Sequence, residues 1–129
     1  MGLVKRFSLK EGVSNEELFY MSPMLYSLFA YLLGYCETHE LPCTVTSITG
    51  EAEGRVTATH KEGRAIDVSV RGWSEFHIHR FVKKANNKFA NIGAISSSDY
   101  KPRAVVYHAV DGGAPHFHLQ VKRQLYGDY

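Results

Sequence analysis

Hydrophobic residues recur at helical spacing in two stretches of this chain. Between residues 24 and 39 they lie three or four positions apart, which predicts the main core helix. Ser22 before it is a favoured capping residue, and Pro23 suits the first helical position. A second helical stretch follows Ser74-Glu75, with apolar residues on one face and Arg and Lys on the other. The pattern therefore predicts two helices that each bury one face.

Apolar and polar residues alternate in other stretches, which is typical of strands. This alternation, together with many β-branched residues, predicts four strands, at residues 43–49, 65–70, 105–110 and 116–122. Residues 3–9 suit a short edge strand, Ser14 begins a further short helix, and 91–103 carry the Gly, Ser and Pro of a loop. We therefore expect an α+β fold with two or three helices and a small, mostly antiparallel sheet of about four strands, in a single domain over residues 1–129.

Composition narrows the function classes. Hydrophobic residues make up 44% and charged residues 22%, as in an ordinary globular protein. The net charge of +2 comes without a dense basic run, so we expect no nucleic-acid partner. The longest apolar stretch, residues 24–36, is too short to span a bilayer, and no apolar run follows Lys5-Arg6 as a signal peptide requires. We expect a monomer that is cytoplasmic at synthesis.

Two cysteines, Cys36 and Cys43, allow either a disulfide or a pair of buried free thiols. Cys36 lies late in the first helical stretch and Cys43 begins a strand, so we favour buried thiols in a reducing compartment. Neither belongs to a CxxC pattern, which excludes them as metal ligands in this interpretation.

Two histidine-containing segments together suggest a metal site. His60 precedes Asp67 by seven residues, with small residues between them that let the loop fold back. His116 and His118 point to one face of their strand, whereas Phe117 between them points to the other, because side chains alternate. Catalytic zinc commonly takes three ligands from His, Asp or Glu and keeps one position open. The second HxH pattern, His77-Ile78-His79, is predicted to be helical, and its side chains diverge there.

The run from His60 to Asp67, HKEGRAID, closely resembles the HxxGRAxD segment of a zinc peptidase superfamily. That superfamily groups lysostaphin-type enzymes, D-alanyl-D-alanine metallopeptidases and hedgehog N-terminal domains. Residues 116–122 resemble its closing HxH strand, the hedgehog form most of all, and the resemblance covers residues 44–122. It implies that Zn²⁺ is held by His60, Asp67 and His118. It also implies that His116 lies beside the metal and helps to bind or polarise the scissile carbonyl.

The sequence departs from the resembled family at the catalytic base, because Pro115 stands where peptidases of this group often carry an acid. If residues 112–115 form a four-residue turn, Asp111 lies across from His116 and is the candidate base. If the turn has five residues, the pairing shifts and His108 faces the metal instead. His108 also suits a core position or one behind the ligands, and Asp111 suits a turn cap. An Arg near the first motif binds substrate carboxylate in related peptidases, which makes Arg55 a candidate.

The resemblance implies a zinc-dependent peptidase that cuts stem peptides or cross-links of bacterial peptidoglycan. A small chain without an evident signal peptide suits a phage lytic or virion-associated enzyme that acts on the wall after release. The alternative is a hedgehog-like module that keeps the metal for structure or binding and has no base.

Overall fold

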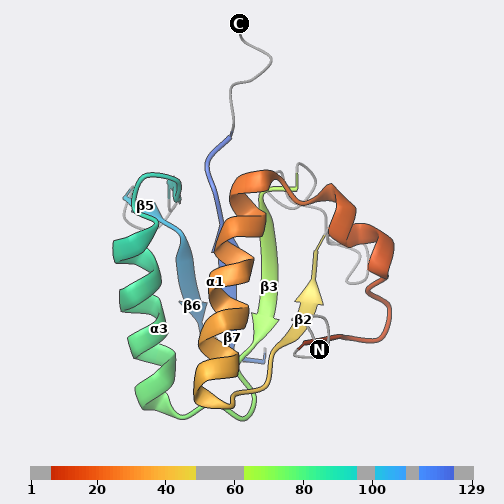
Figure 1. Cartoon of the computed structure of the whole chain (residues 1–129), viewed down its shortest axis with the longest axis vertical. Helices are drawn as coiled ribbons and strands as arrows, with labels where there is room; N and C mark the ends of the chain where they lie inside the picture. Colours follow the sequence, from red (N-terminus) through yellow and green to blue (C-terminus); the bar gives the residue numbers. More distant parts are fainter. Residues whose placement is uncertain (1–6, 49–62, 96–100, 110–113, 124–129) are drawn as a thin grey trace, which may run out of the picture.

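A five-stranded sheet in the order β1-β2-β3-β7-β6 forms the centre of the fold (Figure 1). The structure is a computed structural model that describes residues 7–48, 63–95, 101–109 and 114–123. The strands are β1 (Ser8–Leu9), β2 (Thr44–Ser47), β3 (Ala65–Ser69), β6 (Val105–His108) and β7 (His116–Gln120). The α+β class is confirmed.

The expectation of a mostly antiparallel sheet is wrong, because the sheet is mixed. Its fifth strand, β1, lies within residues 3–9, where a short edge strand was expected beside the four predicted strands. The four predicted strands do pair antiparallel with one another, but β1 joins β2 in parallel, with Ser8 opposite Thr44. Parallel neighbours require a long connection, and here it contains both η2 and α1. Strand β1 has only two residues, so its pattern of apolar and polar side chains cannot show whether it runs parallel or antiparallel to β2.

Three helices accompany the sheet: η2 (Asn15–Tyr20, a 3-10 helix), α1 (Pro23–His39) and α3 (Glu75–Lys88). The predicted starts are confirmed, since the Ser22 hydroxyl accepts a hydrogen bond from the Leu25 N–H at 3.2 Å. The Ser74 hydroxyl caps α3 in the same way through His77 N–H. None of the described helices is long and apolar enough to cross a membrane.

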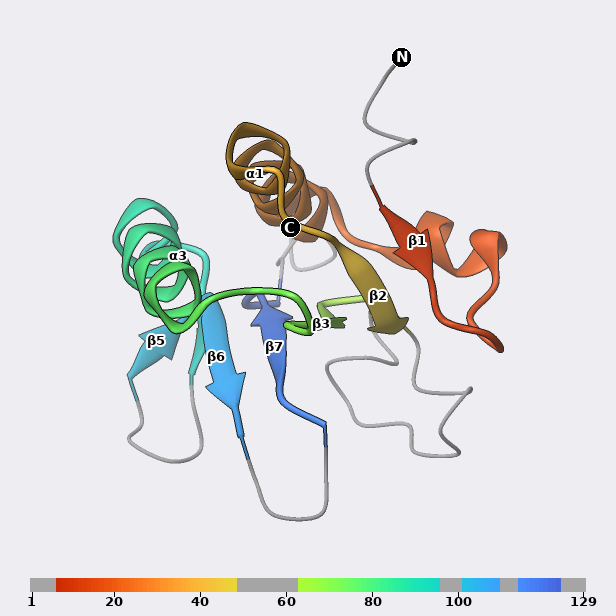
Figure 2. The same cartoon turned by 90° about the horizontal axis from the view of Figure 1, so that it is seen from below.

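Helices α1 and α3 lie side by side on one face of the sheet (Figure 2). The core between these layers is apolar and aromatic, with Phe117 of β7 packed edge-on against Trp73 and in contact with Phe81 of α3. Phe117, Leu119 and Val121 are fully buried, as their alternation predicts. The polar residues that alternate with them therefore lie on the sheet face away from α1 and α3.

Residues 91–103 were expected to be a loop, but they include a small hairpin of β4 (Ala94–Ile95) and β5 (Pro102–Arg103). The Asn86 side chain of α3 accepts hydrogen bonds from the Ala104 and Val105 N–H groups and donates one to the Val105 carbonyl. This amide fixes the start of β6 against α3. Strands of two residues are too short to produce a period-two pattern.

Cys36 and Cys43 are free and buried, which confirms the prediction of two buried thiols. A hydrogen bond with the Cys36 thiol, followed by burial, raises the pKa of Cys43 well above its usual range. The Cys43 thiol therefore stays protonated and unreactive at neutral pH.

Candidate functional site

Asp67 and His118 meet at the centre of the polar sheet face. The two residues are directly opposite each other in the β3–β7 ladder, although 51 positions separate them in the sequence. The His118 Nδ1–H donates a hydrogen bond of 2.8 Å to Asp67 Oδ1. Only 17% of the His118 side chain and 11% of the Asp67 side chain are exposed. This partial removal from water strengthens the attraction between carboxylate and imidazole.

The backbone around Asp67 is held from the other side by β2. Ser47 is buried opposite Asp67, and the Thr46 hydroxyl donates to the Asp67 carbonyl at 3.3 Å. The pairing shifts between Val45 and Ser47, so an irregularity in β2 lies beside the carboxylate. Ser47 was not singled out from the sequence, because nothing in residues 43–49 shows which of them pairs with Asp67.

Two more histidines lie next to this pair on the same face. His108 of β6 is paired with His116 of β7, and their ring centroids lie 5.2 Å apart. The His108 ring is also 5.9 Å from the ring of His118. The His116 Nδ1–H donates to the Ala114 carbonyl at 3.0 Å, which leaves Nε2 as the nitrogen available to a substrate. Three imidazoles and one carboxylate thus share one patch of the sheet.

The β6–β7 register corrects the pairing that would put Asp111 across from His116. His108 occupies that position, three residues earlier in the chain, so the four-residue turn is wrong. The observed pairing also differs from the one that a five-residue turn would give, which shifts the register by one residue. His108 nevertheless lies on the same sheet face as His116 and His118. The sequence predicts His108 only as the alternative to Asp111, because period-two alternation alone does not fix which residue of β6 pairs with His116.

Burial lowers the pKa of His108, and the neighbouring His116 and His118 lower it further, while Asp67 acts in the opposite direction. Burial is the largest of these causes, because the ring has lost part of the water that would stabilise its charged form. The two neighbouring imidazoles act in the same direction as burial. A neutral His108 ring can accept a proton through one of its nitrogens.

Gly63 sets the path by which the chain enters β3. Its φ of +71° belongs to the left-handed region, and a Cβ at this position would overlap the Tyr20 carbonyl. The Gly63 carbonyl accepts a hydrogen bond of 2.9 Å from the Ser22 N–H. The glycine therefore lets the segment before Asp67 pack against the junction of η2 and α1. Whether the small residues also bring His60 back to Asp67, as the sequence predicts, stays a prediction, because His60 lies outside the described residues.

Three of the predicted site residues, Arg55, His60 and Asp111, lie outside the described residues. Within the described part of the chain, no group of three or more His, Cys, Asp or Glu side chains is arranged to hold a metal ion. The structure thus brings together Asp67, His116 and His118 of the predicted set.

The histidines of the other HxH pattern have separate partners, as its helical position predicts. His77 Nδ1 lies 2.7 Å from the Tyr35 hydroxyl, between α3 and α1. His79 Nε2 lies 3.6 Å from Glu75, one turn earlier in α3. Both belong to the helical layer and not to the polar sheet face.

Comparisons of this chain with models of known protein families, with curated proteins and with solved structures find no match.

The donor atoms present suit zinc, which binds His nitrogen and carboxylate oxygen at about 2.0–2.2 Å. Two ligand atoms on one tetrahedral ion stand about 3.3 Å apart at these bond lengths. The observed 2.8 Å between Asp67 Oδ1 and His118 Nδ1 would have to widen only slightly, with the ion replacing the shared proton. In a second arrangement, His118 would bind through Nε2 while Asp67 orients the ring from behind. In both arrangements, Asp67 and His118 together fix the position of the ion.

Proposed function

We propose that this protein is a zinc-dependent peptidase that cleaves stem peptides or cross-links of bacterial peptidoglycan. The observation that carries the proposal is the 2.8 Å contact between Asp67 and His118. These two residues come from separate motifs, and the resemblance to lysostaphin-type, D-alanyl-D-alanine and hedgehog-type zinc domains assigns both of them to the metal. The antiparallel β3–β7 pairing that joins them supports a fold of that kind.

In this proposal, His60, Asp67 and His118 hold the zinc ion. Zinc held there would lower the pKa of a water molecule to near neutral, and the metal itself would polarise the carbonyl of the peptide bond. Asp67 and His118 are mostly buried and belong to adjacent central strands, so their donor atoms are held by the sheet and not by a loop. Such pre-positioning limits the reorganisation needed when the metal binds.

His108 is the candidate base that the geometry favours. Its ring lies beside those of His116 and His118, and burial lowers its pKa, which favours the neutral form that can take up a proton from the attacking water. His116 is free at Nε2 to donate to the carbonyl oxygen of the substrate once its ring is protonated. Asp111 stays a candidate on sequence grounds, because it lies in the connection between the strands that carry these rings.

Peptidoglycan is proposed as the substrate on the resemblance alone. Arg55 is the candidate for binding a substrate carboxylate, because an Arg in this neighbourhood has that role in the resembled peptidases and a guanidinium group can form two parallel hydrogen bonds with a carboxylate. The proposed setting is a phage lytic or virion-associated enzyme that reaches the wall after release.

A second candidate function is a zinc-containing binding or structural module without catalysis. The observation that favours it is the register of β6 and β7, which puts an imidazole and not a carboxylate opposite His116. A metal site of this kind would stabilise the polar sheet face and bind a partner without hydrolysing it.

Release of new free amino groups from purified peptidoglycan tests the proposed activity. Zinc-loaded wild-type protein should release them from at least one of several wall types with different cross-links, and metal-free protein should not. The products, separated by mass, identify the bond that is cut. If zinc-loaded protein releases no amino groups from any wall type, the peptidase proposal fails and the binding module takes its place.

A further inference from the structure

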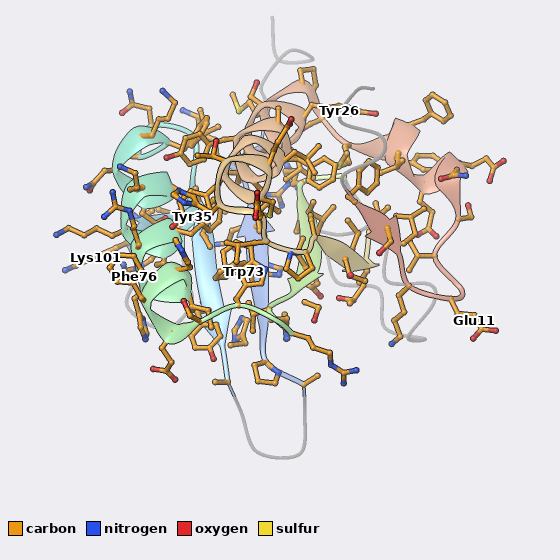
Figure 3. The ribbon with its side chains drawn as sticks, turned by 60° about the horizontal axis from the view of Figure 1, so that its bottom comes forward. Glu11, Tyr26, Tyr35, Trp73, Phe76 and Lys101 are labelled. Atoms are coloured by element: carbon orange, nitrogen blue, oxygen red, sulfur yellow. The ribbon has the colours of Figure 1, made fainter. Side chains whose placement is uncertain are left out.

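Helix α3 carries an excess of positive charge. This helix of fourteen residues contains four of the fifteen Lys and Arg residues but only one of the thirteen Asp and Glu residues. The helix therefore carries +3, whereas the whole chain carries +2. Figure 3 shows nitrogen-tipped side chains projecting outward from α3, on the side of the labelled Phe76.

Three of these cations form one row along the helix. Arg80, Lys84 and Lys88 recur at every fourth position, so neighbours are about 6 Å apart along the helix axis. All three are exposed, and none of them takes part in an ion pair within the described part of the chain. Glu75, the one acid of α3, lies 3.6 Å from His79. Among the residues that the structure describes, the row is thus a line of charges without carboxylate partners.

Aromatic rings support the two ends of this row. The Arg80 guanidinium lies 5.7 Å from the centre of the Phe76 ring, and the Lys88 ammonium lies 5.9 Å from the centre of the Tyr31 ring. Cation–π contacts of this kind hold a long side chain in one place without neutralising its charge. The row is therefore partly ordered before any partner arrives, which lowers the entropy lost on binding.

We infer that Arg80, Lys84 and Lys88 bind a phosphodiester-linked polyol polymer, the anionic chain that accompanies peptidoglycan in many walls. The charges are complementary, and an extended chain of phosphates presents its negative charges at regular intervals, as this row presents its cations. The choice of a wall polymer as the source rests on the proposed function. Binding here would retain the protein at the wall, because α3 lies on the sheet face opposite the candidate site.

Two other polyanionic partners fit the same surface less well. Single-stranded nucleic acid is bound through aromatic rings on which bases stack, but here a cation already lies over the Phe76 ring and another over the Tyr31 ring. A membrane surface is bound through a helix face whose apolar side chains insert into lipid. The buried side chains of α3, Ile78, Phe81 and Ala85, instead pack into the core of the protein.

Binding of purified poly(glycerol phosphate) to the full chain, measured by calorimetry at several salt concentrations, tests this inference. The variant R80Q/K84Q/K88Q should bind roughly ten- to hundredfold more weakly than wild type, because three phosphate contacts are lost. The wild-type logarithmic salt slope should be about −2, since each phosphate neutralised on a single chain contributes about −0.7. The variant K10Q/R71Q/K122Q loses the same charge at exposed positions outside the helices and strands and should bind like wild type.

Equal weakening in both variants would overturn the inference, because attraction would then depend on net charge alone. Absence of binding by wild type would overturn it too, as would tighter binding to an oligothymidylate of equal charge or to vesicles containing anionic lipid. Circular dichroism and melting temperature establish that both variants fold. Polymer binding does not require hydrolysis. Binding of the polymer without release of amino groups from peptidoglycan would therefore refute the peptidase proposal but not the inference about α3.

Discussion

Oδ1 of Asp67 and Nδ1 of His118 lie 2.8 Å apart across the two central antiparallel strands. Neither residue is close to the other in sequence, and both are mostly buried on a sheet face that α1 and α3 do not cover. The contact brings a hard oxygen donor and a borderline nitrogen donor to one point, which is the combination that zinc binds.

The role of Asp67 can be distinguished by its amide variant. If Asp67 is a direct ligand, Asp67→Asn should weaken zinc binding by well over a hundredfold, because the amide retains the shape but loses the charge. If Asp67 only orients His118, the loss should stay within about 10–100-fold. Competition with a chelator of known affinity measures the difference, and an unchanged affinity would show that Asp67 has neither role.

His108 and Asp111 make opposite predictions about the base. His108→Ala should keep zinc and reduce the rate of wall cleavage by about 10²–10⁴-fold, the usual contribution of a general base, while Asp111→Ala should have a small effect. His79→Ala is the matched control, because that histidine lies on α3 with Glu75. The reverse result, with Asp111→Ala inactive and His108→Ala active, would assign the base to the residue first expected from the sequence.

Gly63 should tolerate no side chain. Gly63→Ala combines a strained left-handed backbone with an overlap against the Tyr20 carbonyl, so it should cost at least about 3 kcal/mol of folding free energy. Gly34→Ala is the control, since Gly34 is exposed in α1 and a Cβ there meets nothing within 4 Å. That change should stabilise the protein by about 0.5–1 kcal/mol. Urea unfolding measures both, and equal stability of the two variants would contradict the described path of the chain.

His39 should make folding sensitive to acid. Its ring packs against Tyr35 and His77 at 4.4 and 4.7 Å between centroids. Loss of water lowers the pKa of His39, and the charges of His77, Arg80 and Lys84 lower it further. Because the folded state binds this proton less readily than the unfolded state, stability should fall as the pH drops through 6.5 and level off below the lowered pKa.

The measurement for His39 is the melting temperature between pH 7.5 and 5.5. His39→Gln should lose less stability over this interval than wild type. His79→Gln removes a histidine on the other helix, α3, and should behave like wild type. An identical decrease in His39→Gln and wild type would show that protonation of His39 does not cause the loss of stability in acid.

The helices and the faces of the strands could be predicted from the sequence because their signals are local. Ser22 with Pro23 marks the start of α1, and the alternation around Phe117 shows which side chains of β7 enter the core. Pairing depends on distant segments, and so it could not be predicted in the same way. The parallel addition of β1, and the register that aligns His108 with His116, are both set by connections whose length and path the pattern does not specify.

The candidate site shows the same division. The alternation of residues 116–122 puts His116 and His118 on one face, and the structure confirms this. The β3–β7 register puts Asp67 opposite His118, and a register of this kind cannot be read from a single amino-acid sequence. Arg55, His60 and Asp111 stay predictions, since they lie outside the described residues.

The zinc content of the purified protein tests the central claim most directly. Elemental analysis after dialysis against trace zinc should find about one zinc ion per chain in wild type and in His79→Ala, as expected for a three-ligand site. His118→Ala should retain less than about a tenth of that amount, because one of three protein ligands is lost. Wild-type protein without zinc, or His118→Ala with as much zinc as wild type, would contradict the proposed metal site.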